Sequence, residues 1–496
     1  MSAADAGRAP RDVVIAGRDA PAWLAANVLH SALAPAGVRV TVIELPGTAG
    51  PADVYATLPA LEPLHRRLRI DEGRLLGATR GAFTLGMNFV DTTRQAPSFF
   101  HAYGSTGARI DGVEFLPHWL KARQLGLPVS WEDFCLTAAA AKHGRMLVPD
   151  PDIERNGFTD YGYHLPAIPY AAWLRQRALR AGVETLAATA LRVESADETT
   201  INTLVLDGER RVIGDFFIDA SGTDACLMRA LGVAGDSWRD AFPADRLLVA
   251  HAAPLAAPPA YAEVRAAESG WLALHPSQVC THVVHAFTSD SPDDVALANA
   301  TRLAGLELHA PRIRALSPGR RAVAWRGNCV AVGEAACAFD AIHGVDLQAV
   351  QIGLVHLLPL FPVAGTCDVE RVEYNRNVRA AFDRIRDFQS AHYALNRYAG
   401  AFWNRARLTP LSAELVRKIG VFRARGDLVH YEDESFDIAD WQSLLLGHGV
   451  MPETWDPAAD RTPPEVVKGE LLRILGFIRQ KVESQRTHAQ HLNTRH

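Results

Sequence analysis

The sequence WRGNCVAVGEAACAFDAIHGVDL, residues 325–347, decides the fold more than any other stretch of the chain. A short apolar strand at 329–332 runs into Gly333, small residues follow, and Gly344 opens an apolar helix. Because glycine has no side chain, such a strand–Gly–helix unit lets backbone N–H groups approach a bulky planar or anionic ligand. The stretch therefore predicts a backbone-lined binding site.

Residues 12–45 predict a β–α–β unit that would form a second part of this site. DVVIAG is expected to be a buried strand, APAWLAANVLHSAL a helix, and GVRVTVIE a second strand. A dinucleotide fold carries G-x-G-x-x-G after its first strand, and an acid ending its second strand holds a ribose hydroxyl. The expected cofactor contacts of this unit are Gly17, Asp19, Ala20, Pro21, Ala22 and Glu44.

The loop after the first strand departs from the dinucleotide pattern, since Gly17 is the only one of the three glycines present. Ala22 still permits close packing of the helix against the strand. A carboxylate at Asp19 would repel a pyrophosphate unless Arg18 or a bound cation offsets its charge. An α/β domain that binds no nucleotide is the alternative interpretation.

A third buried strand, FFIDASG at 216–222, ends in Asp-x-Ser-Gly. Strands of this kind recur in two-dinucleotide-type flavoproteins, where they pack beneath the adenine side of FAD. A buried strand with a simple glycine turn is the alternative. The order of the three segments along the chain is more specific than any one of them, and it favours a flavin site.

The bulk composition is that of an ordinary globular protein, with 48% hydrophobic and 22% charged residues among 496. A net charge of −5 gives no reason to expect nucleic acid or an anionic membrane as a partner. The six cysteines are scattered without a CxxC pair, which predicts reduced thiols and no metal site. The sequence has no apolar run of about 18 residues and no signal peptide, so we expect a cytoplasmic protein.

The order of elements predicts a mixed α/β class. An FAD-binding two-dinucleotide-type, Rossmann-like lobe would carry a substrate sheet and be followed by a mostly helical second lobe. The composite FAD domain is expected at 1–370, with pieces at about 10–95, 155–235 and 320–362 and an inserted substrate-side sheet at about 240–310. The helical substrate lobe is expected at 371–496.

The chain resembles the flavin-dependent tryptophan halogenase family in several ordered motifs. They are ATLPAL at 56–61, FFHAYGSTG at 99–107, YGYHLPA at 161–167, IDASG at 218–222, WRGNCVAVG at 325–333, and EYNRNVRAAFDRIRDFQSAHYALN at 373–396 followed by AFW. The resemblance implies a box-shaped FAD domain, a pyramid-like helical lobe, and a tunnel that leads to the substrate.

In that family, reduced FAD and O2 give a C4a-hydroperoxide that a halide attacks. The hypohalous acid formed then reaches a lysine in a GAFK stretch, assisted by a glutamate in EPLES. The matching positions here hold Thr84, which has no amine to deliver a halogen, and His343. The halide loop reads Gly344, Val345, Asp346. Two like charges about 4 Å apart repel by roughly 4 kcal/mol at an effective dielectric near 20, so Asp346 disfavours a bound chloride.

The family motif W.W.IP, which separates the flavin from the substrate, reads Trp271-Leu272-Ala273-Leu274-His275-Pro276 in this chain. Ala273 thus replaces a bulky plug and widens the passage. Together with the other losses, this change predicts that the chain does not halogenate. The expected activity is that of an FAD-dependent monooxygenase that hydroxylates an aromatic substrate through the hydroperoxide. That substrate would be an indole or tryptophan side chain, free or in a peptide.

Roles follow for the residues at these positions. His343 is the predicted catalytic base, because the pKa of an unperturbed imidazole is about 6.5, and Asp346 would orient it or act in its place. Halogenase-like flavoproteins that hydroxylate tryptophan in a partner protein, during tryptophylquinone maturation, are a similar group. The predicted substrate contacts are His101, Tyr103, Thr84, Ala273, Trp441 and Trp455, and Gly333, Glu334 and Leu347 complete the predicted cofactor contacts.

Several alternatives stay open. The whole chain could be a flavin-dependent halogenase or a non-catalytic flavin- or protein-binding module. His343 could cap the following helix, and His101, Tyr103, Trp441 and Trp455 could be packing residues. The expected partners are an aromatic small molecule or a peptide or protein substrate. Reducing equivalents would come from NAD(P)H, directly or through a flavin reductase.

Overall fold

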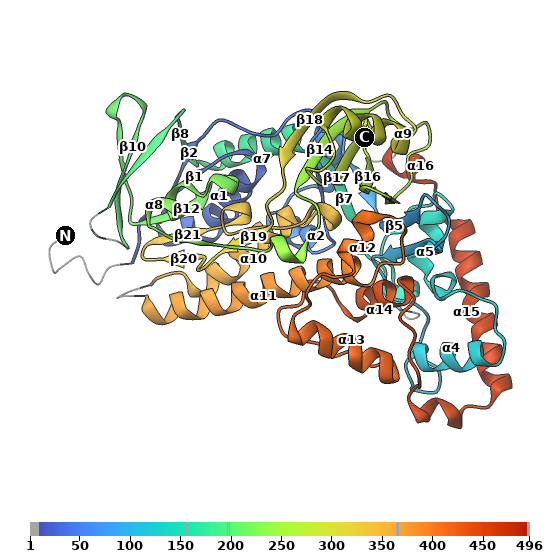
Figure 1. Cartoon of the computed structure of the whole chain (residues 1–496). Helices are drawn as coiled ribbons and strands as arrows, with labels where there is room; N and C mark the ends of the chain where they lie inside the picture. Colours follow the sequence, from blue (N-terminus) through green and yellow to red (C-terminus); the bar gives the residue numbers. More distant parts are fainter. Residues whose placement is uncertain (1–8, 155–156, 196, 198, 364–366, 494–496) are drawn as a thin grey trace. The chain divides into compact units, whose positions relative to one another are not determined.

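The structure is a computed structural model that describes residues 9–154, 157–195, 197, 199–363 and 367–493 (Figure 1). The chain forms two compact units, each assembled from three segments. Unit 1 comprises Met1–Arg80, Leu165–Arg239 and Ser317–Arg386, and unit 2 comprises Gly81–His164, Asp240–Leu316 and Asp387–His496.

Unit 1 is built on a six-stranded sheet in the order β20-β21-β12-β1-β2-β8. Its strands are β1 (Asp12–Gly17), β2 (Arg39–Glu44), β8 (Glu184–Ala187), β12 (Phe216–Ala220), β20 (Trp325–Arg326) and β21 (Cys329–Ala331). All neighbours are parallel except β20 and β21. The central strands β1 and β12 are apolar and buried almost throughout, as strands of a parallel sheet covered on both faces must be.

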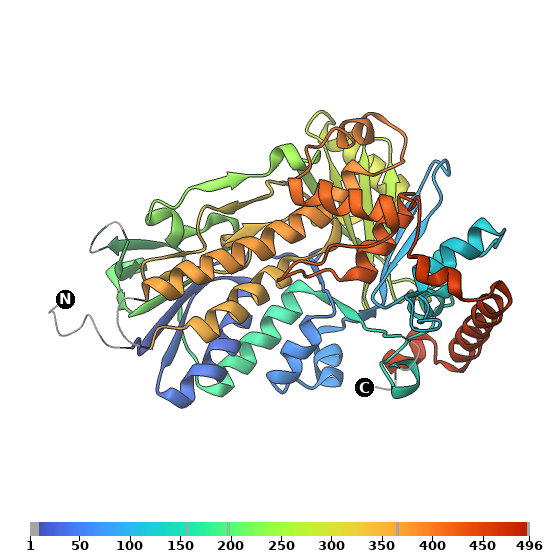
Figure 2. The ribbon, with the colours of Figure 1, turned by 90° about the horizontal axis from the view of Figure 1, so that it is seen from below.

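Helices cover this sheet, and α1 (Asp19–Leu33) contacts β1, β2 and β12. Helices α7 (Ala167–Ala181) and α10 (Asp346–Leu357) flank α1, so that the three run side by side (Figure 2). The remaining helices and strands of unit 1 are α2 (Leu61–Arg67), α3 (Glu72–Thr79), α8 (Cys226–Ala230), β3 (Val54–Ala56), β9 (Leu191–Ser195), β10 (Ile201–Leu206), β11 (Arg211–Ile213), β13 (Gly235–Ser237), β19 (Gly319–Arg321) and β22 (Cys337–Ala338).

Unit 2 is built on a seven-stranded sheet in the order β18-β14-β17-β16-β15-β5-β6. Its strands are β5 (Gly86–Asp91), β6 (Phe99–Ala102), β14 (Arg246–Ala252), β15 (Ala262–Ala267), β16 (Gly270–Pro276), β17 (Thr281–Phe287) and β18 (His309–Ala315). Only β15 and β5 pair in parallel. Strands β4 (Ala82–Thr84) and β7 (Gly162–Pro166) pair antiparallel within another, three-stranded sheet.

One face of the unit 2 sheet carries an apolar core in which residues of β14, β16 and β17 pack against α9 (Asp293–Ala304). The other helices of the unit are α4 (Phe115–Gln124), α5 (Leu136–Lys142), α6 (Pro151–Glu154), α12 (Ala401–Ala406), α13 (Ala413–Arg425), α14 (Ile438–Gly447), α15 (Pro464–Ser484) and α16 (His488–Asn493). The long helix α11 (Asp368–Ala394) contains the chain position at which the two units are divided.

The predicted fold class, an α/β flavoprotein-type lobe with a substrate sheet and a helical second part, is confirmed. The division of the chain differs from the predicted boundary between residues 370 and 371, because the sheet expected as an insert at about 240–310 belongs with the C-terminal helices. Hydrogen bonds account for this: the indole N–H of Trp403 donates to the carbonyl of Ala267 at 2.7 Å, and that of Trp271 donates to the Tyr393 hydroxyl at 2.8 Å.

Three sequence predictions concern smaller features. All six cysteines are free thiols. Among the described residues, no group of three or more His, Cys, Asp or Glu side chains could hold a metal ion. Within the same part of the chain, no helix is long and apolar enough to cross a membrane.

Buried histidines predict that acid destabilises the fold. Burial lowers the pKa of several of them, among which His65 falls to about 4, His275 to about 3, His448 to about 3 and His488 to about 4. Below pH 6.5 the unfolded chain binds protons at these sites while the folded chain does not, so the free energy of unfolding falls as pH falls. Each site contributes roughly 1.4 kcal/mol per pH unit in that window.

The expected result is a steep decrease in the thermal midpoint between pH 6.5 and 5. Asp219 and Asp437, whose pKa values are raised by burial, act in the opposite direction, but the histidines outnumber them. A variant of the exposed His143, His143→Gln, should keep the full slope. A midpoint that stays constant from pH 7.5 to 5 would contradict the prediction.

Candidate functional site

The turn between β1 and α1 brings backbone close to backbone in unit 1. A Cβ on Gly17 would lie 2.7 Å from the carbonyl oxygen of Ala220 and 2.8 Å from the Cβ of Ala22, so only glycine fits. Ala20 and Ala22 are fully buried, as expected for residues at which helix and strand pack closely. The N-cap of α1 is Arg18, without a side-chain capping bond, so the helix N-terminus is available to an anion.

Asp19 does not confront a pyrophosphate in the way that the sequence suggested. It has a left-handed backbone, φ +54°, and its carboxylate accepts hydrogen bonds from the loop after β2. The donors are the Thr48 N–H at 2.9 Å, the Thr48 hydroxyl at 3.0 Å and the Ala49 N–H at 3.3 Å. Arg18 pairs with Asp224 instead, at 2.9 Å. The charge of Asp19 is thus offset by loop donors rather than by Arg18.

Glu44 ends β2, where the ribose-binding acid of a dinucleotide fold stands. Its carboxylate accepts from Nε of Arg175 at 2.9 and 3.1 Å, and the guanidinium lies 5.5 Å from the centre of the Trp23 ring. This arrangement holds the carboxylate in one orientation at the carboxyl end of the sheet. Glu44 is half-buried and therefore still reachable by a ligand.

The IDASG strand has a structural role that the sequence did not reveal. Asp219 is fully buried and accepts from the N–H groups of Ser221, Leu227 and Met228 at 3.1, 2.8 and 3.0 Å, and from the Ser221 hydroxyl at 2.6 Å. Burial raises the pKa of this carboxyl, and the four hydrogen bonds oppose that shift. Asp219 therefore fixes the start of α8 beside the first-strand turn.

Gly333 faces the start of α1 from the other side. It has a left-handed backbone, φ +60°, and a Cβ there would lie 2.9 Å from Val350 and 3.7 Å from Pro21. Glu334 follows at a half-buried position, and Leu347 is buried in the first turn of α10. The predicted cofactor residues of the two glycine turns are therefore brought together in unit 1.

Near its C-terminal end, the stretch 325–347 forms a short 3-10 turn, η7 (Ala341–His343). The N-cap residue Asp340 accepts a hydrogen bond from the Ile342 N–H at 3.0 Å. His343 is buried. Gly344 has a left-handed backbone, φ +59°, and a Cβ there would lie too close to Ala56. The N-cap of α10 is Val345, so His343 is not the cap residue of that helix.

Asp346 is the first residue of α10, where a helix dipole favours a carboxylate. A halide at this N-terminus would compete with that carboxylate. Burial, reinforced by the charges of Asp19, Asp346, Glu334 and Asp53, raises the pKa of the Tyr55 phenol well above its usual value. This part of unit 1 therefore carries a negative field that works against anion binding beside α10.

These features fit an FAD molecule. The close turns at Gly17 and Gly333 would let backbone N–H groups approach the cofactor. The open N-terminus of α1 would bind a phosphate, and the oriented Glu44 would accept a hydrogen bond from the ribose. The residues predicted from the sequence to hold the cofactor lie at these turns and strand ends, and their role stays a prediction. Only Asp19 differs, because its side chain binds the neighbouring loop.

Thr84 lies in unit 2 on β4, opposite Gly162 of β7. It is buried, and its hydroxyl donates to the carbonyl of Gly86 at 3.0 Å. The side chain thus serves the local turn and presents no basic group.

Ala273 lies in the middle of β16, buried between Val264 and Val284 of the neighbouring strands. Trp271, two residues earlier on the same face, is fixed by its hydrogen bond to Tyr393. The first ring of the W.W.IP motif, Trp271, is therefore held rigidly, and Ala273 takes the place of the second ring.

His101, Tyr103 and Trp441 belong to one buried aromatic cluster of unit 2, joined by Phe388 and Phe436. The rings of Phe388 and Phe436 stack at 3.8 Å, and Trp441 meets Phe388 edge-on at 4.9 Å. His101 lies 5.5 Å from Phe388 and bonds through Nε2 to Asp440 at 2.8 Å. Trp455 lies outside this cluster, where its indole N–H donates to Asp460 at 3.2 Å.

An ion pair that sequence reasoning missed lies against the cluster. Lys418 and Glu434 pair with side chains only 3% and 2% exposed. The ammonium is 4.4 Å from the centre of the Trp441 ring and 5.0 Å from that of Tyr431. The sequence gives no signal for this pairing, because the helical pattern of α13 does not show which carboxylate of the following loop will pair with Lys418.

Unit 2 contains a large cleft of about 1160 Å³, enough for a substrate larger than one aromatic amino acid. Its lining combines apolar and aromatic side chains with charges of both signs: Phe115, Leu116, Trp131, Phe158 and Ile438, with Arg109, Glu114, Arg425, Asp427, His430, Asp437 and Arg461. The predicted substrate contacts His101, Tyr103, Trp441 and Trp455 are not among the lining residues, although Asp437 and Gln442 of the same region are.

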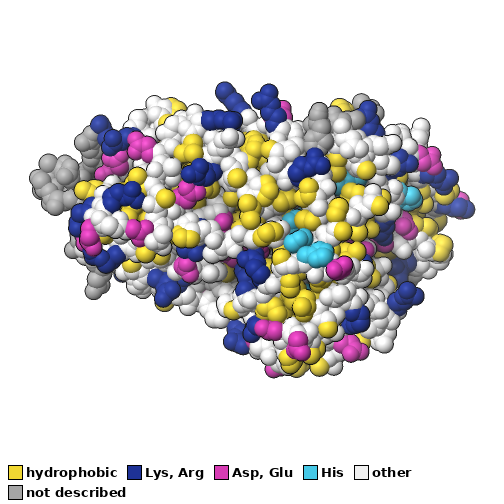
Figure 3. All heavy atoms as spheres, turned by 90° about the horizontal axis from the view of Figure 1, so that it is seen from above, with side chains coloured by type: hydrophobic (Ala, Val, Ile, Leu, Met, Phe, Trp, Pro, Cys, Tyr) yellow, Lys and Arg dark blue, Asp and Glu magenta, His cyan; other side chains and the backbone are white. Residues whose placement is uncertain are grey.

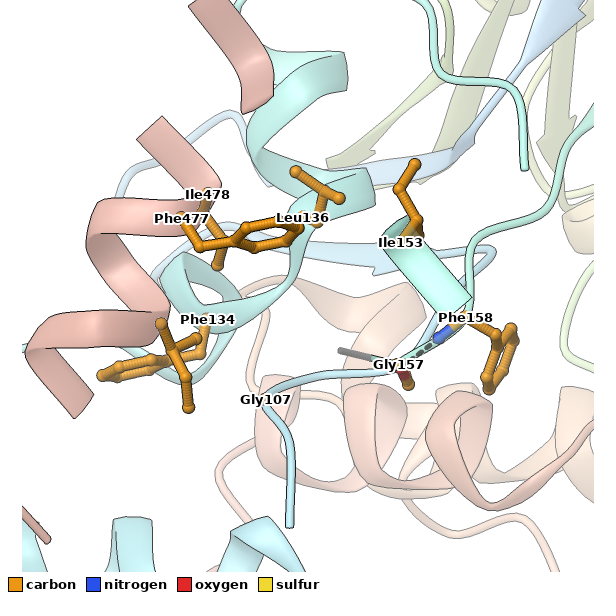
Figure 4. Close-up of a pocket in the computed structure, with 10 residues that line it drawn as sticks. Gly107, Phe134, Leu136, Ile153, Gly157, Phe158, Phe477 and Ile478 are labelled. Carbon is orange, nitrogen blue, oxygen red and sulfur yellow. Dashed lines mark hydrogen bonds between the residues drawn. The ribbon is translucent and has the colours of Figure 1, made fainter. Parts of the chain in front are cut away.

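A second cavity in unit 2 is too small for a substrate. It measures about 20 Å³ and is lined by apolar side chains of α5, α6 and α15, including Leu136, Ile153 and Phe477 (Figure 4). The Phe158 N–H donates to the Ser105 hydroxyl at 2.9 Å at its edge, drawn as a dashed line in the figure. Such a space holds one water at most, so the cavity is a packing feature.

The fold and the site define a flavoprotein of the two-dinucleotide type, and comparison with known proteins names its family. Residues 12–464 match the tryptophan halogenase family. BrvH, a flavin-dependent halogenase from Brevundimonas sp. BAL3, is 30% identical, with 98% of this chain and 99% of that chain covered and a TM-score of 0.91. A flavin-dependent halogenase from Xanthomonas campestris is also 30% identical, with 98% of each chain covered and a TM-score of 0.92.

Among characterised sequences, the tryptophan 6-halogenase ThaL of Streptomyces albogriseolus is 24% identical over 510 residues, which cover 93% of this chain and 94% of that protein. The chain belongs to the tryptophan halogenase family. The resemblance expected from the motifs is thus confirmed. The preference for hydroxylation is not supported by these relatives, which favour the halogenase alternative.

Gly333 provides a test of the cofactor site. In Gly333→Ala the added methyl group would meet Val350 at 2.9 Å in a left-handed backbone, so we expect a loss of about 1–3 kcal/mol in stability and weaker FAD binding. FAD titration and thermal unfolding measure both. Gly420→Ala is the matched control, because nothing lies within 4 Å of a Cβ there and the residue is in helix α13. Equal affinity and midpoint in Gly333→Ala and the native chain would disprove the assignment.

Proposed function

We propose that the chain is a flavin-dependent halogenase that acts on an indole-type aromatic ring, free or carried by a larger molecule. The observation that carries this proposal is end-to-end similarity, at 30% identity, to two flavin-dependent halogenases. The FAD-compatible turns of unit 1 support it. Reduced FAD would be supplied by a flavin reductase that draws on NAD(P)H.

Bound reduced FAD would supply, with O2, the oxidant that converts a halide into an electrophile. The residues of this chain would do the rest. Backbone groups at Gly17, Gly333 and the N-terminus of α1 would hold the dinucleotide. Glu44, oriented by Arg175, would hold the ribose.

Hydroxylation is the second candidate, and Thr84 is the observation that favours it. Without an amine at this position the chain lacks the halogen-delivering lysine of its family. Asp346 at the start of α10 weakens a halide site, and Ala273 leaves space for a substrate to approach. In that case His343, with Asp346, would remove a proton from the ring or its N–H group.

Product mass distinguishes the two chemistries. The purified chain is supplied with FAD, a flavin reductase, NADH, O2, bromide and an indole or a tryptophan-containing peptide. Halogenation is expected, seen as a product with the bromine isotope pair. A product heavier by oxygen would instead favour hydroxylation. If the chain neither binds FAD nor takes up oxygen, halogenation and hydroxylation are both contradicted. The chain would then be a non-catalytic binding module.

Asp346→Ser tests the electrostatic argument. Removal of the carboxylate from the first turn of α10 should increase the apparent affinity for bromide by about tenfold, a change of about 1.4 kcal/mol that allows for screening at this half-buried site. The bromide dependence of product formation measures it. Asp293→Asn, which removes a first-turn acid from α9 in unit 2, is the control for net charge.

An unchanged bromide dependence in Asp346→Ser would show that the charge does not act on a halide. If the product is hydroxylated, His343→Ala and Asp346→Ser should both lower its rate. A His343→Ala enzyme with full hydroxylation would then exclude His343 as the base.

A further inference from the structure

Three histidines lie together in the interior of unit 2, on the sheet face that carries Ala273. Side chains alternate along a strand, so Trp271, Ala273 and His275 of β16 share one face. His282 of β17 is the direct cross-strand partner of His275. His164 of β7 packs its ring against His275, with centroids 5.1 Å apart and planes at 84°. We call His164, His275 and His282 the imidazole cluster.

The cluster belongs to a longer row of histidines across the sheet. His282 pairs with His251 of β14, which pairs with His309 of β18, so four strands carry histidine at matching register. His282 and His275 are buried, His251 is half-buried and His309 is exposed. Histidine side chains also gather in the middle of the surface seen in Figure 3. The row thus connects the imidazole cluster to solvent.

The imidazole cluster adjoins the position of the missing lysine. Thr84 of β4 pairs with Gly162 of β7, two residues before His164. Thr84 and His164 therefore lie on the same face as diagonal neighbours, about 7–8 Å apart, which long side chains can span. The side-chain amide of Gln278 donates to the carbonyl of Gly81 at 2.6 Å and ties the turn after β16 to the start of β4.

Hydrogen bonds leave basic ring nitrogens in the cluster. His164 Nδ1 lies 3.0 Å from the carbonyl oxygen of Pro276, which can only accept, so Nδ1 carries the proton and Nε2 keeps a lone pair. Nδ1 of His275 is enclosed and has no hydrogen-bond partner among the described residues. Nε2 of His282 faces the Cys280 thiol at 3.3 Å.

Both rings of the central pair are neutral near pH 7. Burial, together with the charge of His282, lowers the pKa of His275 to about 3. Burial, together with His275 and then with His282 and His488, holds the pKa of His164 well below its usual value. Burial also raises the pKa of the Cys280 thiol, so this neighbour adds no negative charge. A neutral ring has a lone pair for an electrophile, whereas a lysine must first lose a proton.

We propose that His275 accepts the electrophilic halogen from hypohalous acid and passes it to the aromatic ring, with His164 as its positioning residue. The family motif places isoleucine at this position, and a buried imidazole without a complete set of hydrogen bonds costs free energy that packing alone does not explain. The inference rests on the halogenase function proposed above, which supplies the hypohalous acid.

The atoms balance in two steps. The lone pair of one ring nitrogen attacks the halogen, the halogen–oxygen bond breaks, and the departing hydroxide takes the proton of the other ring nitrogen to leave as water. The aromatic carbon then attacks the halogen of the N-haloimidazole, and the electrons of the nitrogen–halogen bond return to the ring. The proton released by the aromatic carbon restores the imidazole N–H. The aromatic carbon is oxidised by two electrons and the halogen is reduced.

His275→Ile, which restores the residue of the family motif, tests the proposal. Reactions with FAD, reductase, NADH and bromide are run with an indole and, separately, with a soluble dione that traps hypobromous acid. We expect His275→Ile to release trapped hypobromous acid at the native rate, while brominated indole falls by a factor on the order of 10². A purely structural role would lower both. Unchanged indole bromination in His275→Ile would overturn the proposal.

Two further variants sharpen the result. Thr84→Lys in the His275→Ile background places an amine beside the cluster and should restore bromination. His251→Val changes another histidine of the row and should leave both rates at the native level. Loss of bromination in His251→Val equal to that in His275→Ile would show that His275 has no special role.

A flavin-free measurement separates failure of this inference from failure of the proposed function. The native and His275→Ile chains are treated with a small excess of hypochlorite, desalted, and titrated for active chlorine with thionitrobenzoate. The native chain should retain more than the variant. If the native chain retains more yet makes no halogenated product with flavin, the proposed function fails and the reactivity of His275 stands. Equal retention overturns the inference.

Discussion

The close approach of strand and turn at Gly17 is the constraint on which unit 1 depends. The backbone of β1 meets Ala220 of β12 at a distance that excludes any side chain, and Gly333 approaches α1 from the opposite side under the same restriction. These two contacts set where β1, β12 and β21 end and where α1 and α10 begin. A cofactor bound there would be held mainly by backbone, which would allow the site to lose two glycines of the usual loop. It does not tolerate the loss of either close contact.

The parts of the fold that depend on local pattern were predictable from sequence. The strand DVVIAG, the helix after it and the strand–Gly–helix stretch at 325–347 carry their signals within a few turns of chain. Asp19 was misjudged because its partners lie 29 and 30 residues away, in a loop whose path no periodicity reveals. The role of Asp219 in binding the start of α8 was missed for a different reason. In the sequence, a buried acid that ends a strand gives the same pattern whether its carboxylate binds a ligand or the N–H groups of a helix.

The imidazole cluster shows the same limit more sharply. His275 and His282 are close in sequence, but their pairing depends on the register of β16 and β17, and a shift by one residue would place them on opposite faces. His164 joins them from a strand more than 100 residues earlier. The domain boundary was displaced for a related reason, because long-range hydrogen bonds from Trp271 and Trp403 decide which unit the sheet joins. Pairing over such distances follows from the folded chain and not from any window of sequence.

Lys418 is a buried amine of unit 2, and its surroundings explain why it does not replace the missing lysine of the family. To attack an electrophile, a lysine must be unprotonated, but the Lys418 ammonium is enclosed by Glu434, Trp441 and Tyr431. Loss of its proton would leave the Glu434 carboxylate buried without a partner, which is strongly unfavourable, and would forfeit the attraction of the cation to both rings. This lysine is thus held in its charged form by the same contacts that hold it in place. His275 is in the reverse situation, since burial favours its neutral form and its most enclosed nitrogen has no hydrogen bond to lose. Of Lys418 and His275, only the imidazole is in the protonation state that reaction with an electrophilic halogen requires.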